Sequence, residues 1–123
     1  MTPFYTGKGD SGKTGFLGEG RISKSSTRIE ALGSVDEASA ALGLARALTE
    51  NESVQEILLQ VQKHLYLLMS ELSADSKTAN QFDRIQQGEV DWLEEQILKL
   101  EKTVTVPREF ILPGQCAASA ALA

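Results

Sequence analysis

A length of 123 residues fits a single domain (residues 1–123) that is large enough to bury a core. Its 12 basic and 17 acidic side chains leave a net charge of −5, which argues against a general nucleic-acid binder or a coat for anionic membranes. The single cysteine, Cys116, excludes an intrachain disulfide and a zinc site built from several thiolates.

The first 25 residues are rich in Gly, Ser, Thr and Lys, and they predict an extended segment or short strand followed by a loop. Residues 7–14 read GKGDSGKT and match the phosphate-binding pattern G-x-x-x-x-G-K-[ST]. Such a loop presents backbone N–H groups and a lysine to phosphate oxygens, so we expect a nucleotide ligand. The P-loop fold needs a buried strand before this pattern and a helix directly after it. Because only Met1–Thr6 precede the pattern and the glycine-rich residues 15–20 follow it, we predict phosphate binding without the P-loop fold.

Three kinds of side chain in this segment suit a polyphosphate. The glycines that permit positive φ are Gly7, Gly9 and Gly12. The cations that can neutralise phosphate are Lys8, Lys13 and Lys24. The hydroxyls that can bind phosphate or Mg²⁺-bound water are those of Thr6, Ser11 and Thr14. The alternative is a flexible, solvated N-terminal arm without a ligand.

Helical periodicity begins sharply after this segment. Apolar residues three and four apart predict helices over Thr27–Leu48 and Glu52–Ser73, and a third helix from near Gly88. Ser26 or Thr27 is the expected N-cap of the first helix, with Glu30 placed as in a capping box. The fold class is therefore all-α: an up-down bundle of four to five helices over residues 26–123, preceded by the segment 1–25 that we expect to bind a nucleotide.

The sequence ends within an apolar stretch, residues 117–123, that begins a further helix. We expect a last segment to be absent from this sequence, because an apolar helix that stops without a cap leaves its stripe unpartnered. No apolar run approaches the roughly 20 residues that span a bilayer and no signal-peptide pattern opens the chain, so we expect a cytoplasmic protein.

Several residues on the helices are candidates for a site. Asp36 and Glu37 are adjacent, so their side chains point about 100° apart, and either one faces the interior, a neighbouring subunit or a ligand, or both form an exposed pair. Arg28 either contacts the phosphate loop, where it would reinforce the anion site that a helix N-terminus already provides, or caps the helix. His64 lacks a second ligand at metal spacing, which favours a surface or core-edge position. Phe110 precedes Ile-Leu-Pro-Gly in an irregular segment, where it lines a pocket or, by default, packs in the core.

Four segments taken together, residues 5–14 (YTGKGDSGKT), 23–24 (SK), 28–37 (RIEALGSVDE) and 110–114 (FILPG), resemble the PduO-type ATP:cob(I)alamin adenosyltransferases. The resemblance extends over nearly the whole chain in the same order. It implies a helical-bundle homotrimer with active sites between subunits, ATP, Mg²⁺ and cobalamin at the site, and a separate reductase that supplies electrons. We expect no metal site held by the protein alone and, from the net charge, no nucleic acid or membrane as partner.

The family's site residues carry over by position. The implied nucleotide contacts are Thr6, Gly7, Lys8, Gly9, Thr14, Gly15 and Lys24, with Arg28 as a further candidate and Asp10 shaping the loop or serving the metal. Asp36 matches the aspartate that pairs with an arginine on the corrinoid side, and Phe110 matches the aromatic residue that excludes the lower axial ligand of cobalt. This chain has Gly7 where the family usually has a basic residue, which moves the expected phosphate contact to Lys8. It ends before the family's Arg-rich stretch.

The implied chemistry needs no nucleophile from the protein, since Co(I) attacks the 5′ carbon of ATP and expels triphosphate. The work left to the protein is positioning and charge stabilisation. Two other functions stay open. A P-loop phosphotransferase would need an apolar strand that ends in Asp, and none is seen; a non-catalytic helical interaction module would not bind ATP.

Overall fold

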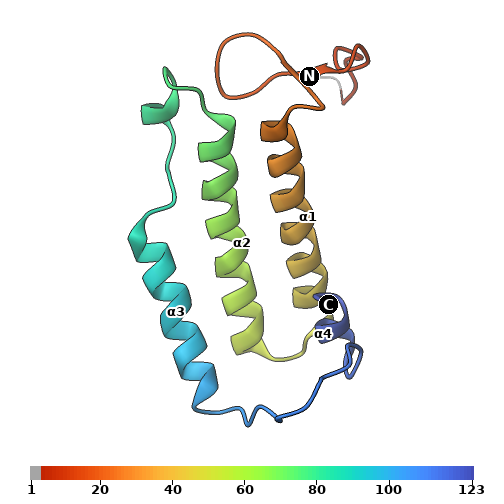
Figure 1. Ribbon diagram of the computed structural model, residues 1–123, viewed down its shortest axis with the longest axis vertical. Coiled ribbons are helices and arrows are strands. Elements are labelled where there is room, and N and C mark those ends of the chain that lie inside the picture. Colours follow the sequence, from red (N-terminus) through yellow and green to blue (C-terminus); the bar gives the residue numbers. More distant parts are fainter. Residues whose placement is uncertain (1–3) are drawn as a thin grey trace.

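The computed structural model describes residues 4–123, so the part of the predicted extended segment at residues 1–3 lies outside the described residues. Helices α1 (Thr27–Leu48) and α2 (Glu52–Ser73) form an antiparallel pair, and α3 (Gln87–Glu101) runs beside α2 (Figure 1). A short 3-10 turn, η1 (Ala79–Gln81), interrupts the connection between α2 and α3. The one-turn helix α4 (Ala117–Ala120) packs against α1. The predicted bounds of the first two helices are confirmed, and the third begins one residue before Gly88.

The N-terminal segment forms a small hairpin that precedes the helices in the sequence. Strand β1 (Lys13–Thr14) pairs antiparallel with β2 (Ile22–Ser23), with Lys13 opposite Ser23 and Thr14 opposite Ile22. The loop between the two strands reaches across to the end of α2 (Figure 1). The glycine-rich segment therefore sits at the end of the helix pair where α1 starts and α2 stops.

Local capping explains where the helices start. The Ser26 hydroxyl accepts the N–H of Ile29 at 3.4 Å, and the side-chain oxygen of Asn51 accepts the N–H of Val54 at 3.1 Å. The capping box predicted for Glu30 is wrong, because the cap is Ser26 and the residue three positions later is Ile29. A capping box does form at α3, where the Glu89 carboxylate accepts the N–H of Gln86 at 2.7 Å.

The helices form an open layer rather than a closed core. Within residues 4–123, only Ala45 and Ala74 are buried apolar residues. The apolar face predicted for α3 is solvent-exposed, with Val90 44% and Ile97 48% accessible. The expectation of a substantial core is therefore wrong for the single chain, because three helices side by side bury only the stripe that each turns to its neighbour.

A ring contact links α2 to α3. His64 meets Trp92 edge to face, with ring centroids 5.1 Å apart and planes at 84°, and its Nε2 lies 2.8 Å from Gln60 Nε2. This confirms the core-edge position of His64. Lys99 Nζ lies 2.9 Å from Glu95 Oε1, an exposed i,i+4 ion pair on α3. In the described part of the chain, no helix has both the length and the apolar character needed to cross a membrane.

Candidate functional site: a glycine-rich loop at the start of helix α1

Two consecutive turns shape the glycine-rich loop. The N–H of Asp10 donates to the carbonyl of Gly7, and the N–H of Gly12 donates to that of Gly9, each at 3.1 Å. Gly7 and Gly12 adopt positive φ values of 66° and 79°, where a side chain would be strained. The sequence prediction is thus confirmed for these two glycines.

Gly9 is needed for a different reason from the predicted one. Its φ is not in the positive range, but a Cβ there would lie 3.0 Å from the Nζ of Lys24. The backbone N–H of Lys24 donates to Gly12 at 2.9 Å, which brings the chain after β2 back over the loop. Absence of a side chain at Gly9 lets the Lys24 ammonium approach the backbone.

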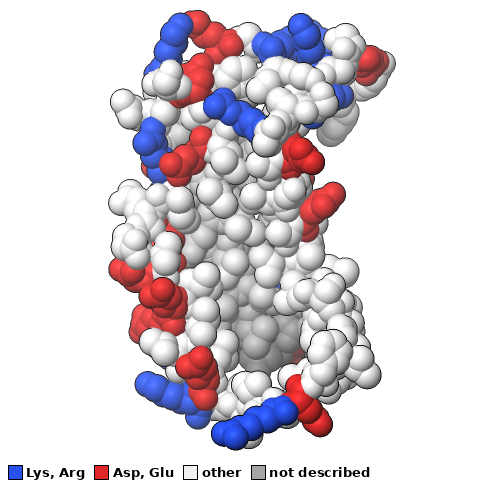
Figure 2. Space-filling model, in the orientation of Figure 1, with Lys and Arg blue, Asp and Glu red and all other residues white. Residues whose placement is uncertain are grey.

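The lysines predicted to neutralise phosphate do gather around this loop. Lys8, Lys13 and Lys24 are all exposed, and the β1–β2 pairing together with the Lys24 bond to Gly12 holds them in one small region. In the space-filling view, blue side chains cluster over the N-terminal loop (Figure 2). A cluster of exposed cations on a chain of net charge −5 provides local attraction for an anion.

The remaining loop residues supply hydroxyl and carboxylate groups. The hydroxyl oxygen of Thr6 lies 3.5 Å from the N–H of Lys8, and the hydroxyl of Thr14 donates to the carbonyl of Gly15 at 3.3 Å. A Cβ at Gly15 would meet open space. Asp10 is exposed, and no group of three His, Cys, Asp or Glu residues able to hold a metal occurs within residues 4–123.

Arg21 is a residue of this site that the sequence reasoning missed. Its Nη2 donates to the carbonyl of Lys8 at 2.8 Å and to that of Lys13 at 2.7 Å. No spacing pattern marks Arg21, because its partners are backbone carbonyls, which have no residue signature. Only the hairpin turn between β1 and β2 brings it beside them.

The loop is anchored to α2 by a second feature that the sequence did not reveal. Leu17 pairs with Ala74 as an isolated bridge, in which the N–H of Leu17 donates to Ser73 at 2.9 Å and the N–H of Asp75 donates to Leu17 at 3.2 Å. A Cβ at Gly18 would collide with the Asp75 carboxylate, so the chain passes at a point where only glycine fits.

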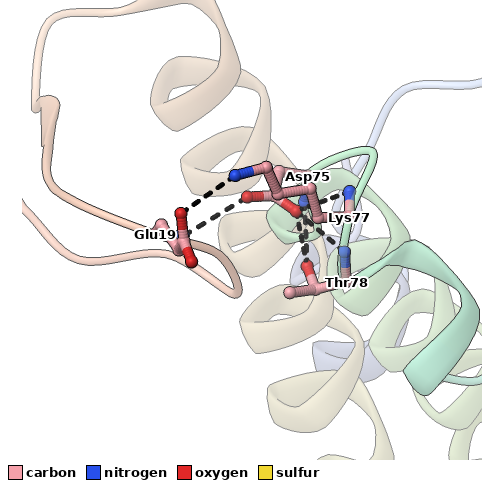
Figure 3. A network of polar contacts seen from close by, with 4 residues as sticks. All are labelled: Glu19, Asp75, Lys77 and Thr78. Atoms are coloured by element: carbon pink, nitrogen blue, oxygen red, sulfur yellow. Dashed lines mark hydrogen bonds and ion pairs between the residues drawn. The ribbon is translucent and has the colours of Figure 1, made fainter.

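The Asp75 carboxylate is the centre of this anchor (Figure 3). Its Oδ1 accepts the N–H groups of Thr78 at 2.8 Å and Lys77 at 2.9 Å, while Oδ2 accepts the N–H of Glu19 at 3.3 Å. The Thr78 hydroxyl also contacts the carbonyl of Leu17. The backbone hydrogen bond from Thr78 is the main cause that lowers the pKa of Asp75, and the other donors add to it. Lys77 Nζ closes the group with an exposed ion pair to Glu19 at 3.0 Å.

Arg28 lies beside the segment that follows the glycine-rich loop, where it contacts Phe16. Its guanidinium carbon is 5.9 Å from the centroid of the Phe16 ring, a cation–π contact at the first turn of α1. The contact stacks Arg28 on the segment between the glycine-rich loop and the Asp75 anchor. Arg28 thereby adds a positive charge near the N-terminus of α1, beside the loop.

Asp36 and Glu37 are both exposed on α1, so the interior position considered for one of them is wrong in the single chain. The physical reason is that α1 turns only part of its surface toward α2, and at these positions Val35 is half-buried while Asp36 and Glu37 are exposed. Asp36 lies nine residues after Thr27, which places it roughly 14 Å along the helix from its start.

Phe110 is 86% exposed, so core packing is wrong for it as well. It belongs to the irregular segment 102–116, which crosses the end of the helices opposite the glycine-rich loop (Figure 1). The structure of one chain therefore brings the predicted nucleotide residues together but leaves Phe110 apart from them.

The surroundings of the loop differ from those of a P-loop, as predicted. Among the described residues no strand precedes Gly7, and the next elements after Thr14 are β2 and only then α1. The phosphate-binding pattern is instead presented by a hairpin.

A family model described as cobalamin adenosyltransferase matches residues 4–123. The chain belongs to this family. A corrinoid adenosyltransferase of Citrobacter freundii is 36% identical over 123 residues, which cover 99% of this chain and 70% of that protein. The corrinoid adenosyltransferase PduO of Salmonella typhimurium is 35% identical over 119 residues, which cover 96% of this chain but 35% of that longer protein.

Solved structures agree with the fold. A variant of the PduO-type ATP:corrinoid adenosyltransferase from Lactobacillus reuteri, complexed with cobalamin and ATP, matches with a TM-score of 0.85 and 26% identity over 97% of this chain and 67% of that one. A second variant of that enzyme, complexed with ATP, matches with a TM-score of 0.81 and 30% identity over 96% of this chain and 67% of that one. The predicted family and helical-bundle fold are confirmed.

Proposed function

We propose that this protein transfers the 5′-deoxyadenosyl group of ATP to the cobalt of a cob(I)alamin, giving adenosylcobalamin and triphosphate. The observation that carries the proposal is the convergence of Lys8, Lys13 and Lys24 on a loop with two positive-φ glycines, in a member of this family. The relatives are named as corrinoid adenosyltransferases, and one of the two L. reuteri structures is complexed with cobalamin and ATP and the other with ATP.

The chemistry matches what the loop offers. The Co(I) electron pair attacks the 5′ carbon, a Co–C bond forms, the C5′–O bond breaks, and its electrons leave on triphosphate. The transition state therefore gains negative charge on the phosphate side, where preorganised cations and backbone N–H groups stabilise it most. Lys8 and Lys24 are the principal charge partners in this proposal, with the Thr6 and Thr14 hydroxyls and the backbone of Gly7, Gly9 and Gly15 completing the cradle.

Magnesium would enter with the nucleotide. Mg²⁺ typically takes one or two carboxylates together with substrate phosphates and water, and Asp10 is the carboxylate of the loop. In this proposal the Thr14 hydroxyl would hold a water of that ion.

The corrinoid side of the site would form between subunits. The segment 102–116, which carries Phe110, and the glycine-rich loop lie at opposite ends of the helix pair (Figure 1). Asp36 is exposed on α1, so in this proposal a neighbouring copy brings an aromatic ring and a partner for Asp36 to the nucleotide. We propose a homotrimer with Phe110 excluding the lower axial ligand, which makes the reduction of cobalt to Co(I) by a separate reductase easier. The exposed apolar face of α3 is available for such contacts.

The direct test is an anaerobic assay with chemically reduced cobalamin and ATP. Loss of the Co(I) absorption bands with release of intact triphosphate is expected; persistent Co(I) bands, or release of orthophosphate, would overturn the proposal. Lys8→Met and Lys24→Met should raise KM for ATP at least several-fold, while Lys102→Met, an exposed lysine after α3, should not.

Mixing two impaired variants tests the shared site. If the loop and Phe110 of different subunits meet, mixed Lys8→Met and Phe110→Ala subunits should regain part of the activity that each variant loses alone, measured at limiting ATP and starting from cob(II)alamin with a reductant. Absence of any recovery, in mixtures shown by mass spectrometry to contain both subunits, contradicts a site shared in this way.

A further inference from the structure

The Arg21 side chain bridges two backbone carbonyl groups of the glycine-rich loop. One nitrogen, Nη2, donates to the carbonyl oxygens of Lys8 and Lys13 at 2.8 and 2.7 Å. Both distances are those of charge-assisted hydrogen bonds, which are about twice as strong as neutral ones. Arg21 thus ties the first turn of the loop to the strand that ends it.

These bonds orient peptide groups as well as holding the chain. The carbonyl of Lys8 and the N–H of Gly9 belong to one planar trans peptide, so they point in opposite directions. With the carbonyl drawn to Arg21, the N–H of Gly9 faces away from the guanidinium, and it has no protein acceptor among the described residues. A donor without a partner, on a loop surrounded by lysines, suits a phosphate oxygen.

The charge of Arg21 is not neutralised by a carboxylate. The ion pairs within residues 4–123 are Lys77–Glu19 and Lys99–Glu95, and neither involves Arg21. Because the guanidinium is always protonated, it strengthens the positive field of the loop while it turns the negative ends of two carbonyls away from an incoming anion.

We propose that Arg21 is a positioning residue of the nucleotide site, which acts through the carbonyls of Lys8 and Lys13 to present the Gly9 N–H to the triphosphate of ATP. This inference rests on the proposed function. In this inference two features make the loop specific for a polyphosphate. One is the charge of its lysines, and the other is its backbone, which Arg21 holds in place.

Arg21→Met and Arg21→Lys test the role, with Arg84→Met as the matched control. Arg84 also donates from its guanidinium to a carbonyl, that of Ala79 at 3.3 Å, but lies outside the loop. Arg21→Met should raise KM for ATP about tenfold, with a smaller change in kcat, and should speed hydrogen exchange of the amides of residues 8–14 without nucleotide. Arg84→Met should match the wild type in both readouts.

Arg21→Lys separates charge from positioning. The shorter side chain keeps the charge but loses the guanidinium that bridges the two carbonyls, so it should leave loop exchange fast and restore at most part of the ATP affinity. A wild-type KM together with fast loop exchange in Arg21→Lys would show that the charge alone matters and would overturn the assignment. Unchanged KM and unchanged exchange in Arg21→Met would also overturn it. Helix amides of α1 and α2 serve as the internal check that each variant is folded.

The readouts also separate this inference from the function on which it rests. If the wild type turns over cob(I)alamin and Arg21→Met is indistinguishable from it, the positioning role fails and the transferase remains. If no adenosyl transfer occurs but ATP protects the loop amides in the wild type and not in Arg21→Met, the transferase fails and the role of Arg21 in binding remains.

Discussion

The Asp75 carboxylate accepts the backbone N–H of Glu19 at 3.3 Å, a bond between residues 56 positions apart in the sequence. It joins the end of α2 to the segment 15–20, which follows the glycine-rich loop in the sequence (Figure 3). The loop is therefore held from two sides, by Arg21 within the hairpin and by Asp75 from the helix pair.

Asp75→Asn should make the segment 15–20 more mobile. An amide in this position can no longer accept from Glu19, Lys77 and Thr78 through two anionic oxygens, so we expect faster hydrogen exchange at residues 17–19 and a lower Tm. Asp83→Asn is the matched control, since Asp83 is an exposed aspartate in the same connection between α2 and α3. Equal exchange in the two variants would contradict the anchoring role.

The anchor should depend on pH in a defined direction. The folded pKa of Asp75 is lowered below its ordinary value of 3.8, so its contribution is fully present above that value and is lost as the pH falls through the lower folded pKa. Wild type and Asp75→Asn should therefore differ in Tm at neutral pH and converge below pH 3.8. A difference that persists unchanged in strong acid would show that the carboxylate charge is not the cause.

Gly9→Ala should weaken nucleotide binding without unfolding the helices. The new methyl group would lie 3.0 Å from Lys24 Nζ and push the ammonium away from the loop, so Kd for ATP should rise several-fold. Gly88→Ala, where the added Cβ meets open space, should leave Kd unchanged. Isothermal titration calorimetry measures both, and equal affinities would rule out the close approach of Lys24.

Ser26→Ala should lower the free energy of unfolding by about 1 kcal/mol, because its hydroxyl caps the N–H of Ile29. Thr27→Ala should cost less than about 0.5 kcal/mol, since Thr27 is already inside the helix and makes no capping bond. Urea denaturation of both variants decides between the two caps that the sequence left open. A larger effect at Thr27 would reverse the assignment.

Ala45→Leu should destabilise the α1–α2 pair by about 1–3 kcal/mol through overpacking. Ala45 is fully buried, and the extra atoms have no space between the two helices. Ala40→Leu on the exposed side of α1 should change stability little. Similar denaturation midpoints for the two variants would mean that the helices separate easily.

The sequence by itself determined the helices and the chemical nature of the loop. The 3.6-residue periodicity of the apolar residues predicted the bounds of α1 and α2, because this signal is local. The pattern GKGDSGKT indicated a phosphate ligand, and the residues around it excluded the P-loop fold.

Only the tertiary structure decided how the loop is held and what lies near it. Arg21 acts on carbonyls and Asp75 on backbone N–H groups, and such partners have no side-chain identity from which a sequence pattern could predict them. The exposure of Asp36, Phe110 and the apolar face of α3 likewise depends on how many neighbours each helix has. Periodicity shows that a helix has an apolar side, but burial is a property of the whole packed assembly.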